Sequence, residues 1–177
     1  MNTERYTNAL NELLQSAVQL AQKNHNPAFL PIHIFASALE QDFTATLLHQ
    51  LGLNVKELLE LSETEIRALP RAEGSQLHAD PSIQQLFDAA DRESKEWGDQ
   101  YLSVDILMLA LLQNKLLPIS LQNYFQQHGA TSERVRELLK KIRGGSSVSD
   151  KGAENQYQVL EKYCQDLTAM ARAGKLD

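Results

Sequence analysis

Residues 30–40 read LPIHIFASALE, and residues 102–112 read LSVDILMLALL. A shift of 72 residues aligns these two stretches and also aligns apolar residues that precede them. The aligned pairs are Leu14 with Leu86, Ala17 with Ala89, Phe29 with Tyr101, Leu30 with Leu102, Ile32 with Val104, Ile34 with Ile106, Ala38 with Ala110 and Leu39 with Leu111. Further along, LLHQLGLN from Leu47 aligns with YFQQHGAT from Tyr124 at a shift of 77, so the second copy has gained five residues. Such self-similarity indicates two copies of one structural unit.

Helical periodicity fills both copies. Apolar residues recur every three or four positions over 7–23, and we expect further helices over 31–39, 44–50 and 55–68. The polar, glycine-containing segment 70–80 is typical of a loop, and no segment shows a convincing strand pattern. The sequence therefore predicts an all-α fold of two pseudo-twofold-related four-helix units, repeat one over about 1–69 and repeat two over about 81–142.

The composition changes after Ile142. Residues 143–156 read RGGSSVSDKGAENQ, which is rich in glycine, serine and charged residues and is typical of a flexible linker. Residues 157–177 return to helical spacing, with an apolar stripe formed by Tyr157, Leu160, Cys164, Leu167 and Ala171. Because this stripe has no obvious partner in the chain, we expect a tethered helix that belongs against a neighbouring module beyond these residues.

Charge and hydropathy exclude several classes of partner. The chain has 17 Lys and Arg against 23 Asp and Glu, and its net charge of -6 offers no basic surface for nucleic acid or an anionic membrane. It has no signal peptide pattern and no run of about 18 apolar residues. The one cysteine, Cys164, excludes an intramolecular disulfide and fits a reducing compartment. These features predict a soluble, cytoplasmic protein that binds neither nucleic acid nor membrane.

The known motifs for catalysis and metal binding are missing. A phosphate-binding loop, G-x-x-x-x-G-K-[ST], fails at Gly174-Lys175, since Ala169 replaces the first glycine and Leu176 replaces the hydroxyl residue. The five histidines lack the spacing of metal ligands, and Cys164 lies on an apolar stripe without an activating base. We therefore expect a binding module without enzymatic activity, cofactor or metal in these residues.

Several segments resemble a known family. They are YQVLEKYCQDLTAMARAGKLD at 157–177, the linker sequence at 143–156, ALPRAEGSQ at 68–76 and WGDQYLSVDILMLALL at 97–112. Together they resemble the N-terminal region of the ClpB disaggregases, in the Clp ATPase chaperone family. The resemblance covers essentially the whole chain and implies the Clp N-terminal double-repeat fold. For the full-length protein it implies a homohexamer that uses ATP and Mg²⁺ and works with the DnaK chaperone.

The resemblance also implies a site for unfolded or aggregated polypeptide. In this family a shallow groove between the repeats takes apolar segments. A threonine near the start of the first helix and two acidic residues of the second repeat lie at its rim. The matching residues here are Thr7, Asp99 and Asp105, the last of which is often Glu in the family. Phe87 and Ile106 match family positions near the groove.

Structural roles compete with these assignments. Thr7 suits the N-cap of the first helix. If Ser103 is also an N-cap, Asp105 lies in a first helical turn, where the helix dipole stabilises a carboxylate. Phe87 and Ile106 have the residue types and spacing of a hydrophobic core.

The repeat supplies an independent comparison for the two acids. At a shift of 72, Asp99 corresponds to Pro27 and Asp105 to His33. The first copy is therefore expected to fold without either carboxylate, which favours a functional role for both acids.

The resemblance thus predicts a domain that captures unfolded polypeptide and passes it toward an ATPase ring. Two alternatives stay open. One is an adaptor-docking domain, as in the protease-linked Clp members, which would recognise a folded partner tightly. The other is a spacer or assembly element whose closing helix docks on an ATPase module. A domain that captures unfolded polypeptide is expected to bind it weakly, whereas neither alternative predicts such binding.

Overall fold

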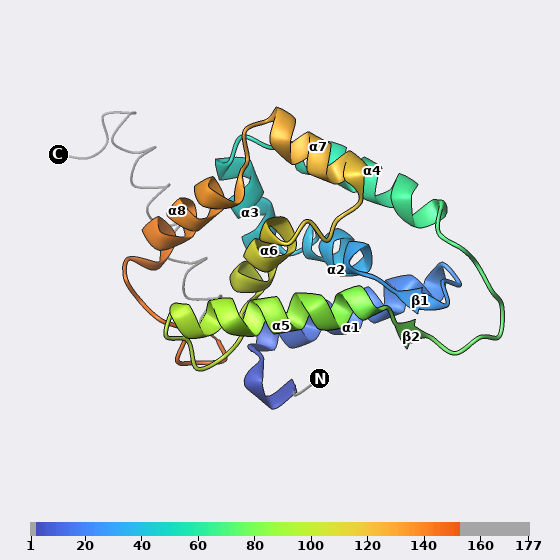
Figure 1. Ribbon diagram of the computed structural model, residues 1–177, viewed down its shortest axis with the longest axis horizontal. Coiled ribbons are helices and arrows are strands. Elements are labelled where there is room, and N and C mark those ends of the chain that lie inside the picture. Colours follow the sequence, from blue (N-terminus) through green and yellow to red (C-terminus); the bar gives the residue numbers. More distant parts are fainter. Residues whose placement is uncertain (1–2, 153–177) are drawn as a thin grey trace, which may run out of the picture.

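The computed structural model describes residues 3–152 of the chain, and this part is mainly helical, as predicted. Repeat one contains the 3₁₀ helix η1 Thr3–Arg5 and the helices α1 Asn8–Lys23, α2 Pro31–Ala38, α3 Asp42–Gln50 and α4 Val55–Arg67. Repeat two contains α5 Pro81–Glu96, α6 Val104–Gln113, α7 Ile119–Gln127 and α8 Ser132–Arg143. Within the described residues the predicted pair of four-helix units is therefore present (Figure 1).

Local sequence determines where several helices begin. The Thr7 hydroxyl accepts a hydrogen bond from the amide of Leu10 at 3.2 Å, which makes Thr7 the N-cap of α1. Asn54 caps α4, Asp80 caps α5 and Thr131 caps α8, each by accepting a hydrogen bond from an amide of the first turn. These caps satisfy amides that have no acceptor within the helix itself.

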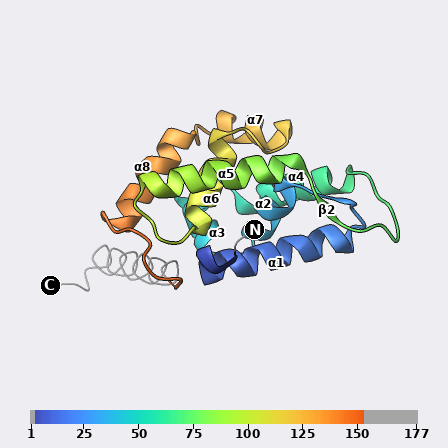
Figure 2. The ribbon, with the colours of Figure 1, turned by 60° about the horizontal axis from the view of Figure 1, so that its bottom comes forward.

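Two short helices form the centre of the fold. Every residue of α2 is buried, and residues 104–111 of α6 are all buried as well. A helix that is apolar on all sides is stable in water only when other elements surround it. Figure 1 shows α2 and α6 between the long helices α1 and α5 on one side and α4 and α7 on the other. Figure 2 shows that α1 and α5 run antiparallel to each other.

The structure corrects the register of the repeat by one residue. Helices α1 and α5 are each 16 residues long and begin 73 positions apart, at Asn8 and Pro81. The buried positions agree at this spacing: Leu10, Leu13, Leu14, Ala17 and Ala21 match Ile83, Leu86, Phe87, Ala90 and Ser94. The predicted shift of 72 is wrong because α2 and α6 are buried on every face, so a one-residue slip still pairs apolar residues. From α3 and α7 onward the spacing is 77, as predicted, and the second repeat gains four residues.

The new register changes the partners of the two acids in repeat one. Asp99 corresponds to Asn26 and Asp105 to Ile32, in place of Pro27 and His33. Asn26 donates through Nδ2 to the carbonyl of Pro70 at 3.1 Å, and Asp99 accepts from the amide of Val148 at 2.8 Å. In each repeat, therefore, the turn after the first helix is tied to the chain that follows the fourth helix.

The structure contains two short backbone pairings that the sequence did not predict. Strands β1 Ala28–Phe29 and β2 His78–Ala79 pair in parallel, and an isolated bridge joins Tyr6 to Leu102. In both cases the residues before the first helix of one repeat pair with the residues before the second helix of the other. Two residues are too few to produce an alternating hydrophobic pattern, so the sequence gives no strand signal here.

The globule continues past the boundary predicted at Ile142. Arg143 is 3% exposed, and Val148 is fully buried and contacts Phe43. The described part of the predicted linker therefore packs against the helices, because it supplies an apolar side chain that the linker-like composition concealed. The remainder of the linker and the closing helix predicted at 157–177, with Cys164, lie outside the described residues.

Candidate functional site

The structure brings the five predicted site residues together at one end of the repeats. The amide of Thr7 donates to the carbonyl of Leu102 at 2.9 Å, which holds the start of α1 beside the start of α6. Asp99 lies in the turn after α5, and Asp105 and Ile106 lie in the first turn of α6. Phe87 of α5 stacks on Tyr6, with ring centroids 5.5 Å apart.

These residues are buried in the folded chain. Thr7 and Ile106 are 0% exposed, Asp105 is 1% exposed and Phe87 is 5% exposed. The side chain of Asp99 is also 0% exposed. Phe87 and Ile106 belong to the hydrophobic core, and Thr7 is the N-cap of α1, so the structural alternatives hold for these three residues. The five residues remain predicted substrate contacts, and direct contact would require this region to open.

Arg143 explains why both carboxylates can be buried. Its Nε and Nη2 atoms donate to the two oxygens of Asp105 at 3.0 and 3.1 Å. Its Nη1 atom lies 2.9 and 3.1 Å from the two oxygens of Asp99. Burial alone would lower the pKa of Arg143, but the attraction of Asp105 and Asp99 outweighs burial and raises that pKa above its usual value. The guanidinium therefore stays charged between the two acids.

The cluster has one more negative than positive charge, and further donors compensate for it. The hydroxyl of Ser103 donates to Asp105 Oδ1, and the amide of Ile106 donates to the same oxygen at 2.9 Å. The amide of Val148 donates to Asp99. Hydrogen bonds to an ionised carboxylate stabilise its charged form in a buried position. The cluster therefore holds the turn after α5, the start of α6 and the end of α8 in one arrangement.

Sequence analysis missed Arg143 because its position falls at the predicted start of the linker. A signal was present, however. Val135, Leu139 and Arg143 are spaced by four residues, and the first two are buried along α8. At helical spacing Arg143 lies on the same face as these apolar residues, which predicts that its side chain points inward and needs a buried acidic partner.

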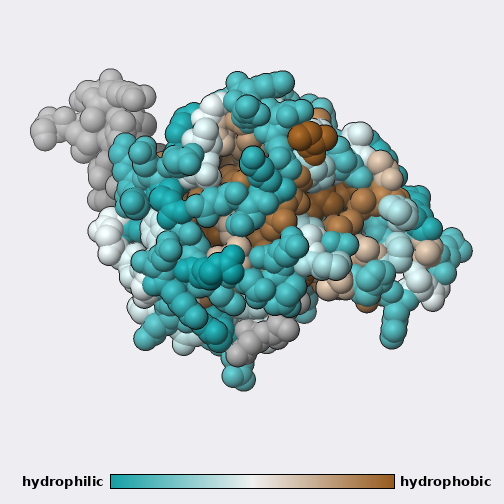
Figure 3. Space-filling model, in the orientation of Figure 1, coloured by the Kyte–Doolittle hydropathy of each residue, from teal (hydrophilic) through white to brown (hydrophobic). Residues whose placement is uncertain are grey.

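A second feature is a pocket with a mixed apolar and polar lining, between the end of α6, α7 and the start of α8. Its volume is ≈ 500 Å³. The apolar lining residues are Leu111, Leu112, Leu117, Ile119, Phe125 and Ala130. The rest of the lining is polar and includes Lys115, Gln122 and Glu133. Ile119 is 67% exposed and is the one large hydrophobic residue of 3–152 that is exposed to solvent. Figure 3 shows apolar surface gathered between α7 and α5 on this face.

The internal repeat shows that helix formation does not require Ile119. Ile119 is the first residue of α7, and Asp42 is the first residue of the corresponding helix α3. A carboxylate at a helix N-terminus is favoured by the helix dipole, whereas an exposed isoleucine there gains nothing from it. The four residues that repeat two has gained also lie here, since α6 is two residues longer than α2 and the loop 114–118 is longer than the loop 39–41. The longer helix α6, the longer loop and the exposed isoleucine therefore distinguish repeat two from repeat one at this point.

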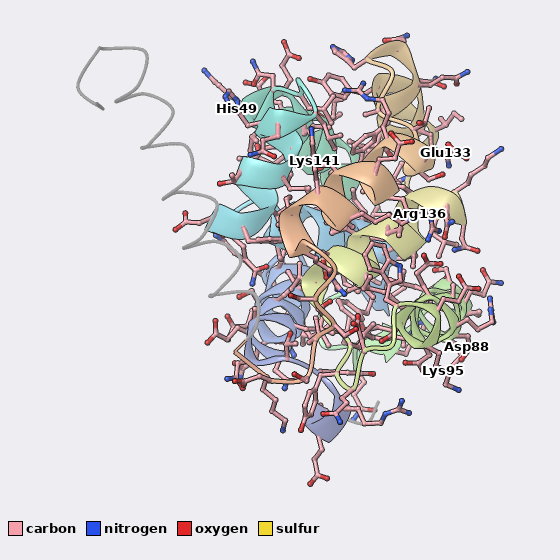
Figure 4. All side chains as sticks on the ribbon, turned by 90° about the vertical axis from the view of Figure 1, so that its left-hand side faces the viewer. His49, Asp88, Lys95, Glu133, Arg136 and Lys141 are labelled. Atoms are coloured by element: carbon pink, nitrogen blue, oxygen red, sulfur yellow. The ribbon has the colours of Figure 1, made fainter. Side chains whose placement is uncertain are left out.

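The side of the molecule formed by α5 and α8 has a different character. Figure 4 shows charged side chains there, with Asp88 and Lys95 on α5 and Arg136 and Lys141 on α8. Arg136 also forms an ion pair with Glu93, which joins the two helices. A surface of mixed charge is well hydrated and is poorly suited to an apolar segment. The pocket beside Ile119 is thus the better candidate for apolar ligands.

Comparison with known families decides the classification. The family model described as "Clp repeat (R) N-terminal domain" matches residues 5–124, which is more than half of the chain. This chain belongs to the Clp N-terminal domain family. The match extends from η1 into α7, so the Clp N-terminal domain described here includes both central helices, and α8 with Arg143 follows the matched range.

Curated relatives of this Clp N-terminal domain include the chaperone protein ClpB of Lactococcus lactis subsp. lactis (strain IL1403). It is 34% identical over 182 residues, which cover 100% of this chain and 21% of the relative. ClpB of Bdellovibrio bacteriovorus is 34% identical over 170 residues, covering 94% of this chain and 20% of the relative. The chain thus spans about a fifth of the length of these relatives. It corresponds to their N-terminal domain, which is not itself the catalytic module.

Solved structures share the fold. The Hsp104 N-terminal domain from Candida albicans has a TM-score of 0.73 and 18% identity, covering 84% of this chain and 98% of that domain. The N-domain of ClpV from Vibrio cholerae has a TM-score of 0.69 and 19% identity, covering 81% and 87%. A complex of the ClpV N-domain with a VipB peptide also has a TM-score of 0.69 and 19% identity, covering 81% and 89%. These likenesses confirm the predicted Clp N-terminal fold.

Among residues 3–152, no group of three or more His, Cys, Asp and Glu side chains could hold a metal ion. Over the same range, none of the helices combines the length and the hydropathy needed to cross a membrane.

Proposed function

We propose that this Clp N-terminal domain captures unfolded or aggregated polypeptide for a ClpB-type disaggregase. In the full-length protein, a cytoplasmic homohexamer that uses ATP and Mg²⁺ takes over the captured chain and works with the DnaK chaperone. The relatives that carry the name ClpB are called chaperones, and the ClpV N-domain of the same fold has been solved with a peptide. Both observations support a polypeptide ligand.

The observation that carries this proposal is the exposed side chain of Ile119 in the pocket between α6, α7 and α8. An exposed isoleucine next to buried leucines offers an unfolded segment a place to remove its apolar side chains from water. Burial of one such side chain contributes roughly 1–2 kcal/mol, so a few contacts give weak binding with little demand on sequence. Weak binding suits a domain that must release its ligand to the ATPase ring.

The predicted contacts Thr7, Asp99, Asp105, Phe87 and Ile106 form a second, separate part of the proposal. Since their side chains are buried, they can act on a ligand only if the Arg143 cluster loosens or if a ligand binds next to it. The two surfaces make different predictions. Binding through the pocket depends on Ile119, whereas binding through the predicted rim depends on the acids.

The test is the affinity of the full chain for a fluorescently labelled, reduced and alkylated polypeptide that stays unfolded. The key variant is Ile119→Asp, which installs the residue that repeat one has at the same position. We expect its affinity to fall about five- to tenfold, or roughly 1 kcal/mol, from the lost apolar contact. The matched control is Gln127→Asp, which adds the same charge on the same helix at an exposed residue outside the pocket, and its affinity is expected to stay unchanged.

Other outcomes would contradict the proposal. Equal affinity of the wild type and Ile119→Asp would rule out the pocket as the binding surface. Tight binding of a folded partner with no response to unfolded polypeptide would instead establish an adaptor-docking domain. If neither ligand binds, the spacer or assembly role is the better description.

A further inference from the structure

The segment that follows α8 lies across the region where family resemblance places the groove rim. Residues 147–151, which we call the strap, return from the end of α8 toward the start of α1. The Ser147 hydroxyl donates to the carbonyl of Trp97 at 2.9 Å, and the carbonyl of Lys151 accepts from the amide of Asn8 at 2.9 Å. The strap thus touches the turn after α5 at one end and the first residue of α1 at the other.

One side chain anchors the strap. Val148 is 0% exposed and packs with Phe43, Tyr101 and Ile142. The neighbouring strap residues 147, 149 and 150 are exposed. A single aliphatic side chain therefore fills a small apolar site, while the residues around it face solvent. We call this site, formed by Phe43, Tyr101 and Ile142, the seat. Burying a valine contributes roughly 1.5–2 kcal/mol, so the seat provides a modest anchor.

Backbone contacts complete the seat and do not depend on the sequence of the strap. The amide of Val148 donates to Asp99 Oδ1 at 2.8 Å, and its carbonyl accepts from the amide of Gln100 at 2.8 Å. The amide of Tyr101 lies 3.4 Å from the same carbonyl. Recognition of an extended segment through its backbone, with one pocket for a side chain, is a common mode of peptide binding. Any segment with a small aliphatic residue at this point can make the same contacts.

We propose that the strap occupies a peptide-binding seat in this domain and that an extended segment with a valine-sized side chain, flanked by small polar residues, competes with it. This inference rests on the proposed function, because it names a second class of contact that the captured polypeptide makes. It also gives the buried Asp99 a role in peptide binding. Its carboxylate accepts a hydrogen bond from the backbone of the strap and would accept the same bond from a competing segment.

The intramolecular arrangement sets the strength of the competition. A short tether holds the strap near its seat at an effective concentration on the order of millimolar. A free peptide with the same contacts must therefore exceed that concentration to bind the wild type. Replacing Val148 removes the competing strap and leaves the seat open to a free peptide.

The experiment uses the full ¹⁵N-labelled chain with Val148→Asp, which places a carboxylate among the apolar side chains of Phe43, Tyr101 and Ile142 and is expected to undock the strap. The probe is the synthetic peptide GSSVSDKG, the sequence of residues 145–152. We expect amide shifts of Gln100 and Tyr101 on titration of the variant, and at least a fivefold weaker response of the wild type. The matched control is Ser149→Asp, an exposed neighbour that should behave like the wild type. The control peptide GSSDSDKG should produce no shifts in any of the three proteins.

Two results would overturn the inference. One is a folded Val148→Asp chain that does not respond to GSSVSDKG at several millimolar. The other is an equal response in the variant and the wild type. If the variant does not fold, hydrogen exchange of the Val148 amide in the wild type gives the answer: saturating unfolded polypeptide must lower its protection. Unchanged protection, combined with binding that depends on Ile119, would reject the strap competition and leave the proposed function standing.

Discussion

Arg143 and Asp105 are joined by two hydrogen bonds of 3.0 and 3.1 Å, and both side chains are only 1% exposed. The pair connects the last residue of α8 to the first turn of α6, so each charge lies at the helix end where the dipole favours it. A buried ion pair contributes little beyond what apolar packing would give, yet removing one partner leaves the other charge without compensation. The pair is therefore a sensitive point of the fold.

Arg143→Met tests this dependence. The variant leaves the carboxylates of Asp99 and Asp105 buried without their cation, so the free energy of unfolding should fall by about 3–5 kcal/mol. Urea denaturation followed by circular dichroism measures the change. Lys141→Met, at an exposed position of the same helix, should stay within about 0.5 kcal/mol of the wild type. A loss below 1 kcal/mol in Arg143→Met would show that the cluster does not hold the fold.

Stability also limits how Asp105 can be tested as a substrate contact. Asp105→Ala removes two acceptors of Arg143, so it is expected to destabilise the domain whatever its effect on binding. Its affinity for unfolded polypeptide must therefore be measured where the variant is fully folded. A normal affinity under those conditions would assign Asp105 a structural role alone.

His33 should make the domain sensitive to mild acid. Burial lowers the pKa of His33 to about 4, and Nδ1 accepts a hydrogen bond from the amide of Leu30 at 3.0 Å. With Nδ1 as the acceptor, Nε2 carries the proton and donates to Asn26 Oδ1 at 2.9 Å, so the neutral ring satisfies both partners. Below pH 6.5, His33 is protonated in the unfolded chain but stays neutral in the folded chain until the pH approaches about 4. The stability present above pH 6.5 is therefore lost as the pH falls toward about 4.

Urea denaturation at pH 7 and pH 5 measures this contribution. Between these values His33 should account for about 2 kcal/mol of the loss in unfolding free energy. The loss should shrink by that amount in His33→Gln, and it should stay as in the wild type in His49→Gln, which alters an exposed histidine. An equal loss in the wild type and His33→Gln would mean that other groups cause the acid sensitivity.

Tyr124 links the two repeats through its hydroxyl. This group accepts from the amide of Asn54 at 3.2 Å and donates to Glu57 Oε2 at 2.8 Å, which joins α7 to the start of α4. Tyr124→Phe should lower the free energy of unfolding by about 1–3 kcal/mol, because the amide and the carboxylate each lose a partner. Tyr101 packs beside Phe43 and Val148 through its ring, so Tyr101→Phe, which keeps the ring, is the matched control with little expected effect. Equal stability of the two variants in thermal denaturation would contradict this role for Tyr124.

The helices were predictable from the sequence because each has a local signal. The apolar run at 104–111 permits only a buried helix, and caps such as Thr7 and Thr131 mark helix starts. The register was harder to predict for the same physical reason. A helix buried on all sides has no polar face to fix its phase. In α1 and α5, a shift of 72 also pairs some buried residues, such as Leu14 with Leu86, and only a shift of 73 pairs all five buried residues of α1 with buried residues of α5.

The candidate site was only partly predictable. The rim positions of Thr7, Asp99 and Asp105 stay a prediction. The structure shows that the two carboxylates are buried against Arg143, which lies 44 residues after Asp99 along the chain. Helical spacing in α8 indicates that Arg143 points inward, but no local pattern identifies the acids that it contacts. Ile119 was within reach of the sequence, because the alignment at a shift of 77 sets it against Asp42 and shows an apolar residue at a position that favours an acid.

The central claim is that unfolded polypeptide binds in the pocket beside Ile119. The most direct test is an NMR titration of the full ¹⁵N-labelled chain with the reduced and alkylated polypeptide. We predict fast-exchange amide shifts that cluster at Leu112, Lys115 and Ile119, with smaller shifts at Gln100 and Tyr101, and loss of the main cluster in Ile119→Asp. Shifts confined to other surfaces, or none at millimolar ligand, would contradict the claim.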